Sequence, residues 1–295
     1  MIWPLAALTA AALQTARNAM QSGLTAQIGT IGATQVRFLY GLPFALAFLA
    51  LATALTGQDI PLPSARVLGF AALGGVAQIA ATALMLFVMK TNGFAISTAW
   101  LKGEPVIVAL IGWAVLGDPL TLPMLAAIAV AVAGVLILSL KPGTGARLAE
   151  LRPAALGLLA GGLFGLSAIG FRGGIVALDQ GDFLIRALTV LVLSLAIQCL
   201  LLMGWMLVFD RRALTGSLRV WRPSLAAGFF GAAASAGWFI AFSLASAAHV
   251  RTLALTEVIF ALLVARFHFG QRVTGRQMLG IAVLMAGVVA LLWAG

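Results

Sequence analysis

Apolar segments follow one another along almost the whole chain, and most of them are long enough to cross a lipid bilayer. A membrane-spanning helix needs roughly 20 mostly apolar residues, so the chain has room for about ten spans joined by short connections. Hydrophobic residues make up 62% of the chain and charged residues only 9%, whereas a soluble protein has about 25% charged residues. A soluble fold would then expose large apolar patches to water. The sequence therefore predicts a polytopic membrane protein.

The expected fold class is all-α, because a bilayer admits only helices or closed barrels and these apolar runs are too long and too continuous for barrel strands. No segment is long and polar enough to form a separate soluble domain. The expected spans cover residues 3–20, 31–55, 67–89, 95–116, 122–140, 154–178, 183–209, 224–246 and 250–269, with a tenth that ends at Leu292.

The two halves of the chain repeat each other. A shift of 153 residues places Glu104 on Glu257, Gly117 on Gly270 and Thr121 on Thr274. The same shift aligns two further apolar triplets, 128–130 with 281–283 and 133–135 with 286–288. We therefore divide the chain into a first five-helix repeat (1–140), a cytoplasmic linker (141–153) and a second five-helix repeat (154–295).

Each repeat holds five expected spans. Because five is odd, the two repeats enter the membrane in opposite orientations. Inverted repeats of this kind are typical of secondary transporters, whose substrate site lies near the bilayer midplane between the repeats. The repeat is therefore the strongest functional signal in the sequence.

The net charge of +10 comes from 18 basic residues scattered among the hydrophobic segments. This scatter fits loop charges of a membrane protein better than a nucleic-acid-binding surface, so no nucleic-acid partner is expected. Most of the basic residues lie in the loops after spans one, three, five, seven and nine, which the positive-inside rule places in the cytoplasm. Both chain ends would then lie on the outer side of the membrane. The expected location is the inner membrane of a bacterial-type cell.

Several short motifs resemble the EamA-type repeat of the drug/metabolite transporter superfamily. The first repeat carries Gly103-Glu104-Pro105-Val106 and Gly117-Asp118-Pro119-Leu120-Thr121. The corresponding residues of the second repeat are Glu257-Val258 and Gly270-Gln271. The second repeat thus has valine in place of Pro105 and glutamine in place of Asp118. The resemblance implies a ten-helix carrier of small metabolites, often amino acids and frequently exported. Members of this family are often placed with both ends in the cytoplasm, and the loop charges here favour the opposite.

Glu104 and Glu257 are candidate substrate or coupling residues, because a carboxylate inside a membrane helix costs about 2.5–3.5 kcal/mol. They would carry a coupling proton or bind a substrate amine, or else each would brace the other half of the protein. Their duplication favours bracing. Lys102 has no counterpart, since Leu255 occupies its place. It is therefore a candidate for binding a substrate carboxylate, against snorkelling or an ion pair with another helix.

Two duplicated arginines, Arg37 and Arg186, resemble the arginine found early in the second helix of each family repeat. They would bind an anionic group or snorkel to the membrane surface, and we favour the structural role. Arg172, Arg251 and Arg266 lie near expected span ends and receive lower weight as functional residues.

Polar and aromatic residues deep in the spans are candidates for the wall of a central cavity. Gln14 and Asn18 belong to a polar stripe on span one, which faces either a cavity or another helix. Gln78, Trp100 and Trp238 lie deep in their own spans, where tryptophan more often packs than contacts a ligand.

The main functional hypothesis is a secondary carrier that exports a small metabolite by alternating access, with protons as a candidate coupling ion. The nearest alternative is proton-coupled efflux of multidrug cations, which relies on an acid in the first helix that is absent here. A membrane scaffold or enzyme is the third, and it lacks a visible nucleophile-base pair. The expected partners are a small-molecule solute and the lipid bilayer, with the chain acting as a monomer or homodimer.

No cofactor or metal is expected. His249 and His268 have no acidic or cysteine partners at ligand spacing. No phosphate-binding loop pattern is present, which argues against ATP-driven transport by this chain alone. Because the sequence shows neither a nucleophile-base pair nor clustered carboxylates for a metal, we expect the chain not to be an enzyme.

Overall fold

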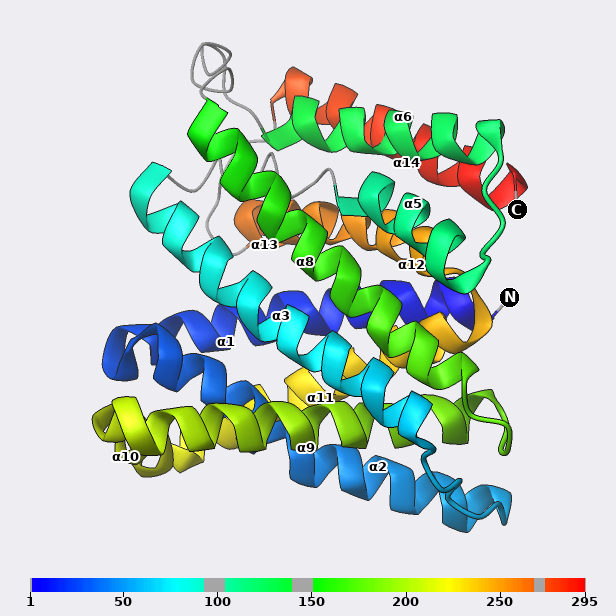
Figure 1. The fold of residues 1–295 in the computed structure, drawn as a ribbon. Helices are drawn as coiled ribbons and strands as arrows, with labels where there is room; N and C mark the ends of the chain where they lie inside the picture. The colour runs from blue at the N-terminus through cyan, green and yellow to red at the C-terminus, as the bar shows by residue number, and fades with distance from the viewer. Residues whose placement is uncertain (1, 93–103, 140–150, 268–273, 295) are drawn as a thin grey trace. The chain divides into compact units, whose positions relative to one another are not determined.

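A computed structural model describes residues 2–92, 104–139, 151–267 and 274–294. Throughout these residues the regular structure is helical, without strands, which confirms the all-α polytopic class (Figure 1). Six described segments are long and apolar enough to cross a membrane: Ile31–Thr56, Ala65–Met85, Ala155–Val176, Phe183–Phe209, Trp221–Leu244 and Gly275–Ala294.

The helices at the start of the chain are α1 (Ile2–Leu39), α2 (Gly41–Thr56) and α3 (Ala65–Asn92). The first helix continues beyond the expected end at residue 20 and is interrupted at Gly29. The backbone there has φ 71° and ψ 175°, a conformation that is essentially restricted to glycine. Residues 21–28 contain Gly23 but no proline, and the helix continues through them to Gly29.

The remaining elements follow in chain order. They are α5 (Glu104–Leu116), α6 (Leu122–Ser139), α8 (Leu151–Val176), α9 (Phe183–Phe209), α10 (Arg211–Arg219), α11 (Trp221–Leu244), α12 (Ala247–Leu253), the 3₁₀ turn η1 (Ala254–Thr256), α13 (Glu257–Phe267) and α14 (Gly275–Ala294). The bounds of α9 are those expected from the sequence. Two other expectations were wrong: the segment after α9, expected to be a loop, contains helix α10, and the expected ninth span is divided into α12, η1 and α13.

Two compact units make up the chain, and neither is one sequence half. Unit 1 comprises Met1–Val76 and Gly170–Leu244, and unit 2 comprises Ala77–Ile169 and Ala245–Gly295. Helices α3 and α8 each contribute residues to both units. Each unit thus combines helices from both sequence repeats, and the domain boundaries assigned from the sequence stay a prediction.

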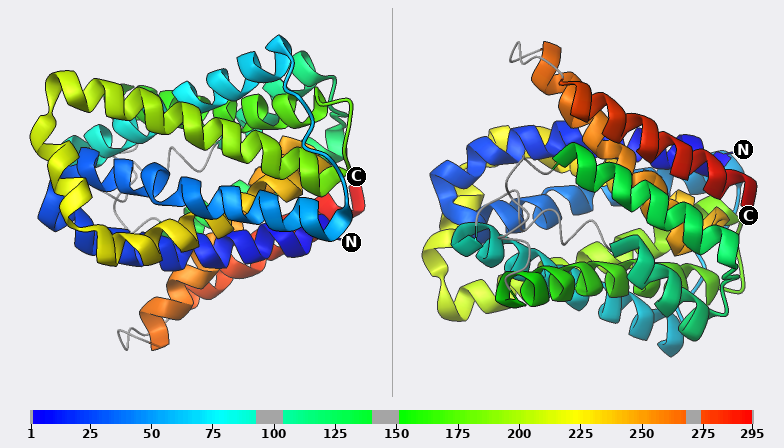
Figure 2. Two further views of the ribbon diagram at one scale, coloured as in Figure 1. Left: turned by 90° about the horizontal axis from the view of Figure 1, so that it is seen from below. Right: turned by 90° about the horizontal axis from the view of Figure 1, so that it is seen from above.

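Unit 1 is built around α1 and α11, which run alongside each other (Figure 2). Helices α2 and α9 pack on the same α11. The α2–α11 contact includes Phe44 and Phe48, whose rings meet Phe229 edge-on at centroid distances of 5.4 and 6.2 Å. Edge-to-face rings add favourable quadrupole contacts to the packing of these helices.

Unit 2 contains a close pair formed by α6 and α14, the last helix of each repeat (Figure 1). A Cβ atom on Gly134 would lie 2.9 Å from the carbonyl oxygen of Gly280, and a Cβ on Gly287 would lie 2.9 Å from that of Ala127. The two contacts exchange places under the 153-residue shift, because Ala127 corresponds to Gly280 and Gly134 to Gly287. Early residues of one helix meet late residues of the other, so α6 and α14 are antiparallel.

The threonine of the repeat motif has one role in both repeats. Thr121 Oγ1 accepts a hydrogen bond from the backbone N–H of Met124 at 3.3 Å. Its counterpart, Thr274 Oγ1, accepts one from the N–H of Gln277, also at 3.3 Å. Each threonine therefore caps the N-terminus of the last helix of its repeat, where backbone N–H groups have no partner within the helix.

Candidate functional site

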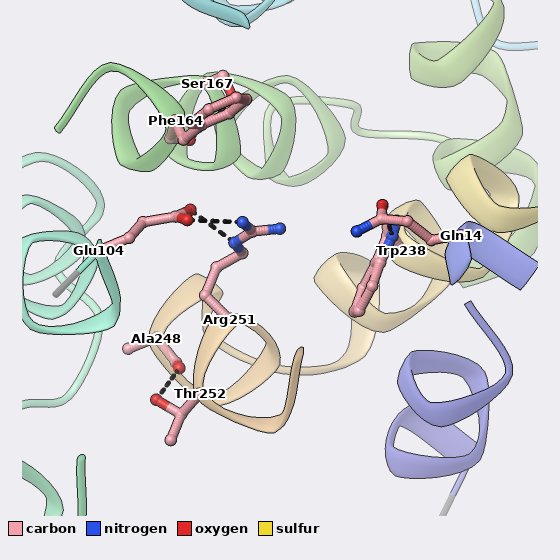
Figure 3. Close-up of polar contacts among 8 residues, drawn as sticks. All are labelled: Gln14, Glu104, Phe164, Ser167, Trp238, Ala248, Arg251 and Thr252. Carbon is pink, nitrogen blue, oxygen red and sulfur yellow. Dashed lines mark hydrogen bonds and ion pairs between the residues drawn. The ribbon is translucent and has the colours of Figure 1, made fainter. Parts of the chain in front are cut away.

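Glu104 and Arg251 form an ion pair in unit 2 (Figure 3). The Nε of Arg251 donates to Oε1 of Glu104 at 2.6 Å, and its second nitrogen, Nη2, donates to Oε2 at 2.7 Å. The side chains are 10% exposed for Glu104 and 23% for Arg251. Two parallel, charge-assisted hydrogen bonds are the strongest geometry available to an arginine and a carboxylate.

Short-range backbone structure positions Arg251 on α12. Ser246 begins this helix by accepting a hydrogen bond from the N–H of His249 at 3.3 Å. The Thr252 hydroxyl, next to Arg251, donates to the carbonyl of Ala248 at 2.8 Å (Figure 3). All the other residues of α12 are buried, so the guanidinium extends from a packed helix.

Glu257 is the first residue of α13, directly after η1. The tighter 3₁₀ turn interrupts the regular helix, and the Thr256 hydroxyl donates to the carbonyl of Leu253 at 2.7 Å within it. Interruptions of this kind are tolerated in membrane helices when side chains bind the freed backbone groups. The negative charge of Glu257 favours the charged form of Arg251, more weakly than that of Glu104.

Sequence reasoning missed the role of Arg251. The signal was present, because Arg251 is a cation without a duplicate: the 153-residue shift places it on Thr98. Lys102 is unduplicated in the same way. The expected ninth span begins at residue 250, which places Arg251 near a span end, whereas α12 begins at Ala247 and the chain around Arg251 is buried.

The chemistry of this cluster is that of exchangeable partners. A guanidinium binds any carboxylate in the same two-pronged way, so the carboxylate of a solute has the groups needed to replace Glu104. Protonation of Glu104 would also remove its charge and weaken the pair. Either event would weaken the contact between Arg251 and Glu104.

Two of the predicted cavity-wall residues form a hydrogen bond in unit 1. The indole Nε1 of Trp238 on α11 donates to Oε1 of Gln14 on α1 at 3.1 Å (Figure 3), and Trp238 is only 6% exposed. The polar stripe of span one therefore makes at least one hydrogen bond between helices. An indole has a single donor, and in Trp238 it is directed to this amide.

The duplicated arginines have different surroundings within unit 1. The guanidinium of Arg37 lies 5.5 Å from the centre of the Phe38 ring. Arg186, in the first turn of α9, donates from Nε to the carbonyl of Asp182 at 3.4 Å. The carboxylate of Asp182 caps this helix by accepting the N–H groups of Leu184 and Ile185. These contacts hold Arg186 against a helix start.

The other predicted residues are more dispersed. Gln78 is half-buried on α3 in unit 2, and its carbonyl accepts the hydroxyl of Thr82 at 2.8 Å. Asn18 lies on α1, with its side chain outside the described part. Lys102 and Trp100 also lie outside the described residues, so their predicted roles remain predictions.

Comparison with known proteins identifies a related family. Residues 152–293 match the family described as the EamA-like transporter family, which confirms the resemblance inferred from the sequence motifs. A search of curated proteins finds no match.

Solved structures share the fold. Matches were found to 28 solved chains. One of them, titled "Crystal structure of protein", has a TM-score of 0.75 and 14% sequence identity, with 99% of this chain and 96% of that chain covered. At this identity the likeness concerns the fold, and it extends over both sequence repeats.

Proposed function

We propose that this chain, whose residues 152–293 match the EamA-like transporter family, is a secondary carrier that exports small metabolites by alternating access. The family makes it a multi-pass membrane transporter whose partners are a small-molecule solute and the lipid bilayer. The proposal adds the transport mode, amino acids and related metabolites as substrates, and the inner membrane of a bacterial-type cell as its location.

The observation that carries this proposal is the cluster of Glu104, Arg251 and Glu257 in unit 2. Ionisable groups inside a membrane are costly, and they commonly mark a substrate or ion pathway. The cluster also adjoins an interrupted helix, and secondary carriers use such helices to present polar groups near the midplane. An ion pair that only braced the fold would not require a second acid near the same arginine.

In the proposed mechanism, Arg251 exchanges carboxylate partners. A substrate carboxylate displaces Glu104 from the guanidinium, and the freed Glu104 accepts a proton or binds the substrate ammonium group. Release of the substrate restores the pair. This exchange links the occupancy of the site to the charge of Glu104, which is the coupling that a proton-driven carrier needs.

Transport assays on the purified chain in liposomes test the proposal. We expect counterflow of at least one amino acid or related metabolite. Glu104→Gln should retain counterflow but lose accumulation driven by a pH gradient, because a glutamine carries no exchangeable charge. Asp59→Asn is the matched control, since Asp59 is an exposed acid in a connecting loop, and it should keep both activities.

Three results would contradict the proposal. Absence of flux for every metabolite in a broad panel would remove the carrier assignment. Resistance of cells to quaternary ammonium dyes that depends on Glu104 would instead support efflux of multidrug cations. Normal pH-driven accumulation by Glu104→Gln would show that the coupling residue lies elsewhere.

We also propose, from the loop charges, that the Asp210–Arg222 segment faces the cytoplasm. The single native cysteine, Cys199, is buried, so an introduced Arg212→Cys gives a selective label. A membrane-impermeant maleimide should label this variant only in inverted vesicles. Labelling in intact cells would reverse the proposed orientation.

A further inference from the structure

The connection between α9 and α11 carries a basic surface that the transport cluster does not use. It consists of α10 and its flanking residues, and its four arginines are Arg211, Arg212, Arg219 and Arg222. We propose that this surface, called here the arginine surface, binds the headgroups of anionic phospholipids.

The position of α10 along the chain places it at the membrane surface. It directly joins two candidate spans, α9 with 27 residues and α11 with 24 residues. At 1.5 Å per residue, α9 is about 40 Å long, longer than the roughly 30 Å hydrocarbon core. Helix α9 is thus long enough for its ends to reach the headgroup region, and α10 continues directly from one of these ends.

Contacts within unit 1 hold α10 in place. Asp210 caps its start by accepting the N–H of Ala213 at 3.0 Å. At its other end the Tyr40 hydroxyl lies 3.1 Å from the carbonyl oxygen of Ser217, to which it donates. Leu214 and Ser217 are buried, and α10 packs against α1 and α9 (Figure 1). The arginines are therefore presented by an ordered helix.

The charges of this surface point outward. All four arginines are exposed. Asp210 is the single acid between residues 208 and 224, and its carboxylate is occupied by the helix cap. Two of the arginines have local contacts: Arg211 Nε donates to the carbonyl of Leu207 at 2.8 Å, and the Arg222 guanidinium lies 5.4 Å from the Trp221 ring centre. The segment thus presents a net positive charge.

Exposed apolar side chains accompany the charges. Phe209 is 71% exposed, Leu218 51% and Trp221 49%. Arginines combined with aromatic and leucine side chains are typical of helices that lie in the membrane interface, where the apolar groups enter the acyl region. Each basic residue near an anionic surface strengthens binding about fivefold, or about 1 kcal/mol. The arginines would bind the phosphodiester headgroup of a lipid, and the apolar side chains would contact its acyl chains. A free anion would contact only the arginines.

The test uses the whole chain in neutral detergent, titrated with phosphatidylglycerol or phosphatidylcholine. The midpoint of thermal unfolding reports binding, because a ligand of the folded state raises it. We expect phosphatidylglycerol to protect more than phosphatidylcholine. The Arg212→Gln/Arg219→Gln double variant leaves the Arg211 and Arg222 contacts intact, and it should weaken the apparent affinity for phosphatidylglycerol by about 25-fold.

Two further variants show whether charge at this surface is responsible. Arg212→Lys/Arg219→Lys should retain most of the affinity. Arg66→Gln removes another exposed arginine beside an aromatic ring, Phe70, and should bind like the unmodified chain. The proposal is overturned if both lipids protect equally, if the double glutamine variant binds unchanged, or if inorganic phosphate protects as well as phosphatidylglycerol. None of these readouts depends on transport.

Discussion

The two sequence repeats are alike in their last helices and unlike around their acids. Helices α6 and α14 meet through contacts that exchange under the 153-residue shift, and both are capped by the motif threonine. In contrast, Glu104 binds Arg251 through two hydrogen bonds, and the position that corresponds to Arg251 in the first repeat is Thr98. The two repeats therefore keep their correspondence at the contact between α6 and α14, and they lose it at the Glu104–Arg251 ion pair.

This difference has a chemical reason under the proposed function. Two identical repeats would give a site with twofold symmetry. An amino acid has a carboxylate at one end and an ammonium group at the other, so it has no such symmetry. An arginine paired with one acid provides a cationic and an anionic group, which suits an asymmetric solute.

Of the changes that test this difference between the repeats, loss of Arg251 should reduce the stability of the protein most. Arg251→Ala leaves the Glu104 carboxylate without its bidentate partner. Breaking a fully buried ion pair in this way costs about 3–5 kcal/mol, and this partly buried pair should cost less. We expect a clear fall in the thermal unfolding midpoint of the purified protein. Arg172→Ala is a reference, since Arg172 also makes a hydrogen bond, to the carbonyl of Phe242 at 2.7 Å in unit 1.

A double-mutant cycle then separates pairing from packing. The Glu104→Gln/Arg251→Gln variant should be more stable than the sum of the single changes predicts, because removing both charges leaves neither one buried alone. Strict additivity would mean that the two side chains are not energetically coupled.

The symmetric contact should respond equally in both repeats. Gly134→Ala and Gly287→Ala each place a methyl group against the backbone of the facing helix, and overpacking of this kind costs about 1–3 kcal/mol or more. The two variants should lose similar stability. Gly162→Ala is the matched control, because no atom lies within 4 Å of the added methyl. Unequal losses at Gly134 and Gly287 would break the symmetry argument.

The smallest effect is expected at the helix caps. Thr121→Ala and Thr274→Ala should each cost about 1 kcal/mol, the usual loss when a capping hydroxyl is removed. Serine at the same positions should retain most of the stability. If either alanine variant lost transport while keeping its unfolding midpoint, the motif threonine would have a role beyond the cap.

Much of the fold was predictable because its signals are local or periodic. The composition and the apolar runs predicted a helical membrane protein. The bounds of α9 were also predictable, because Asp182 caps the helix before Phe183 and Asp210 follows its last residue, Phe209. The segment of α10 is expected from its arginines to be a loop, although the spacing of these arginines also fits a short surface helix. No glycine or proline marks the η1 turn, so that interruption gave no local signal.

The candidate site was only half predictable, for a physical reason. Intramembrane acids stand out in an apolar sequence because their burial is costly, which pointed to Glu104 and Glu257. The partner of Glu104 is 147 residues away along the chain. Such pairing depends on which helices become neighbours, and the sequence alone left Arg251 among several arginines near span ends.

The interleaving of the two units has a consequence for biosynthesis. Unit 1 uses residues up to Leu244, and unit 2 uses α14. A ribosome that has inserted only the first repeat into the membrane has therefore completed neither unit. The early helices must wait in the bilayer, with their polar groups shielded by lipid, water or the insertion machinery, until their partners emerge. We therefore expect the packing of both units to be completed only after the second repeat has been inserted, and neither repeat expressed alone contains a complete unit.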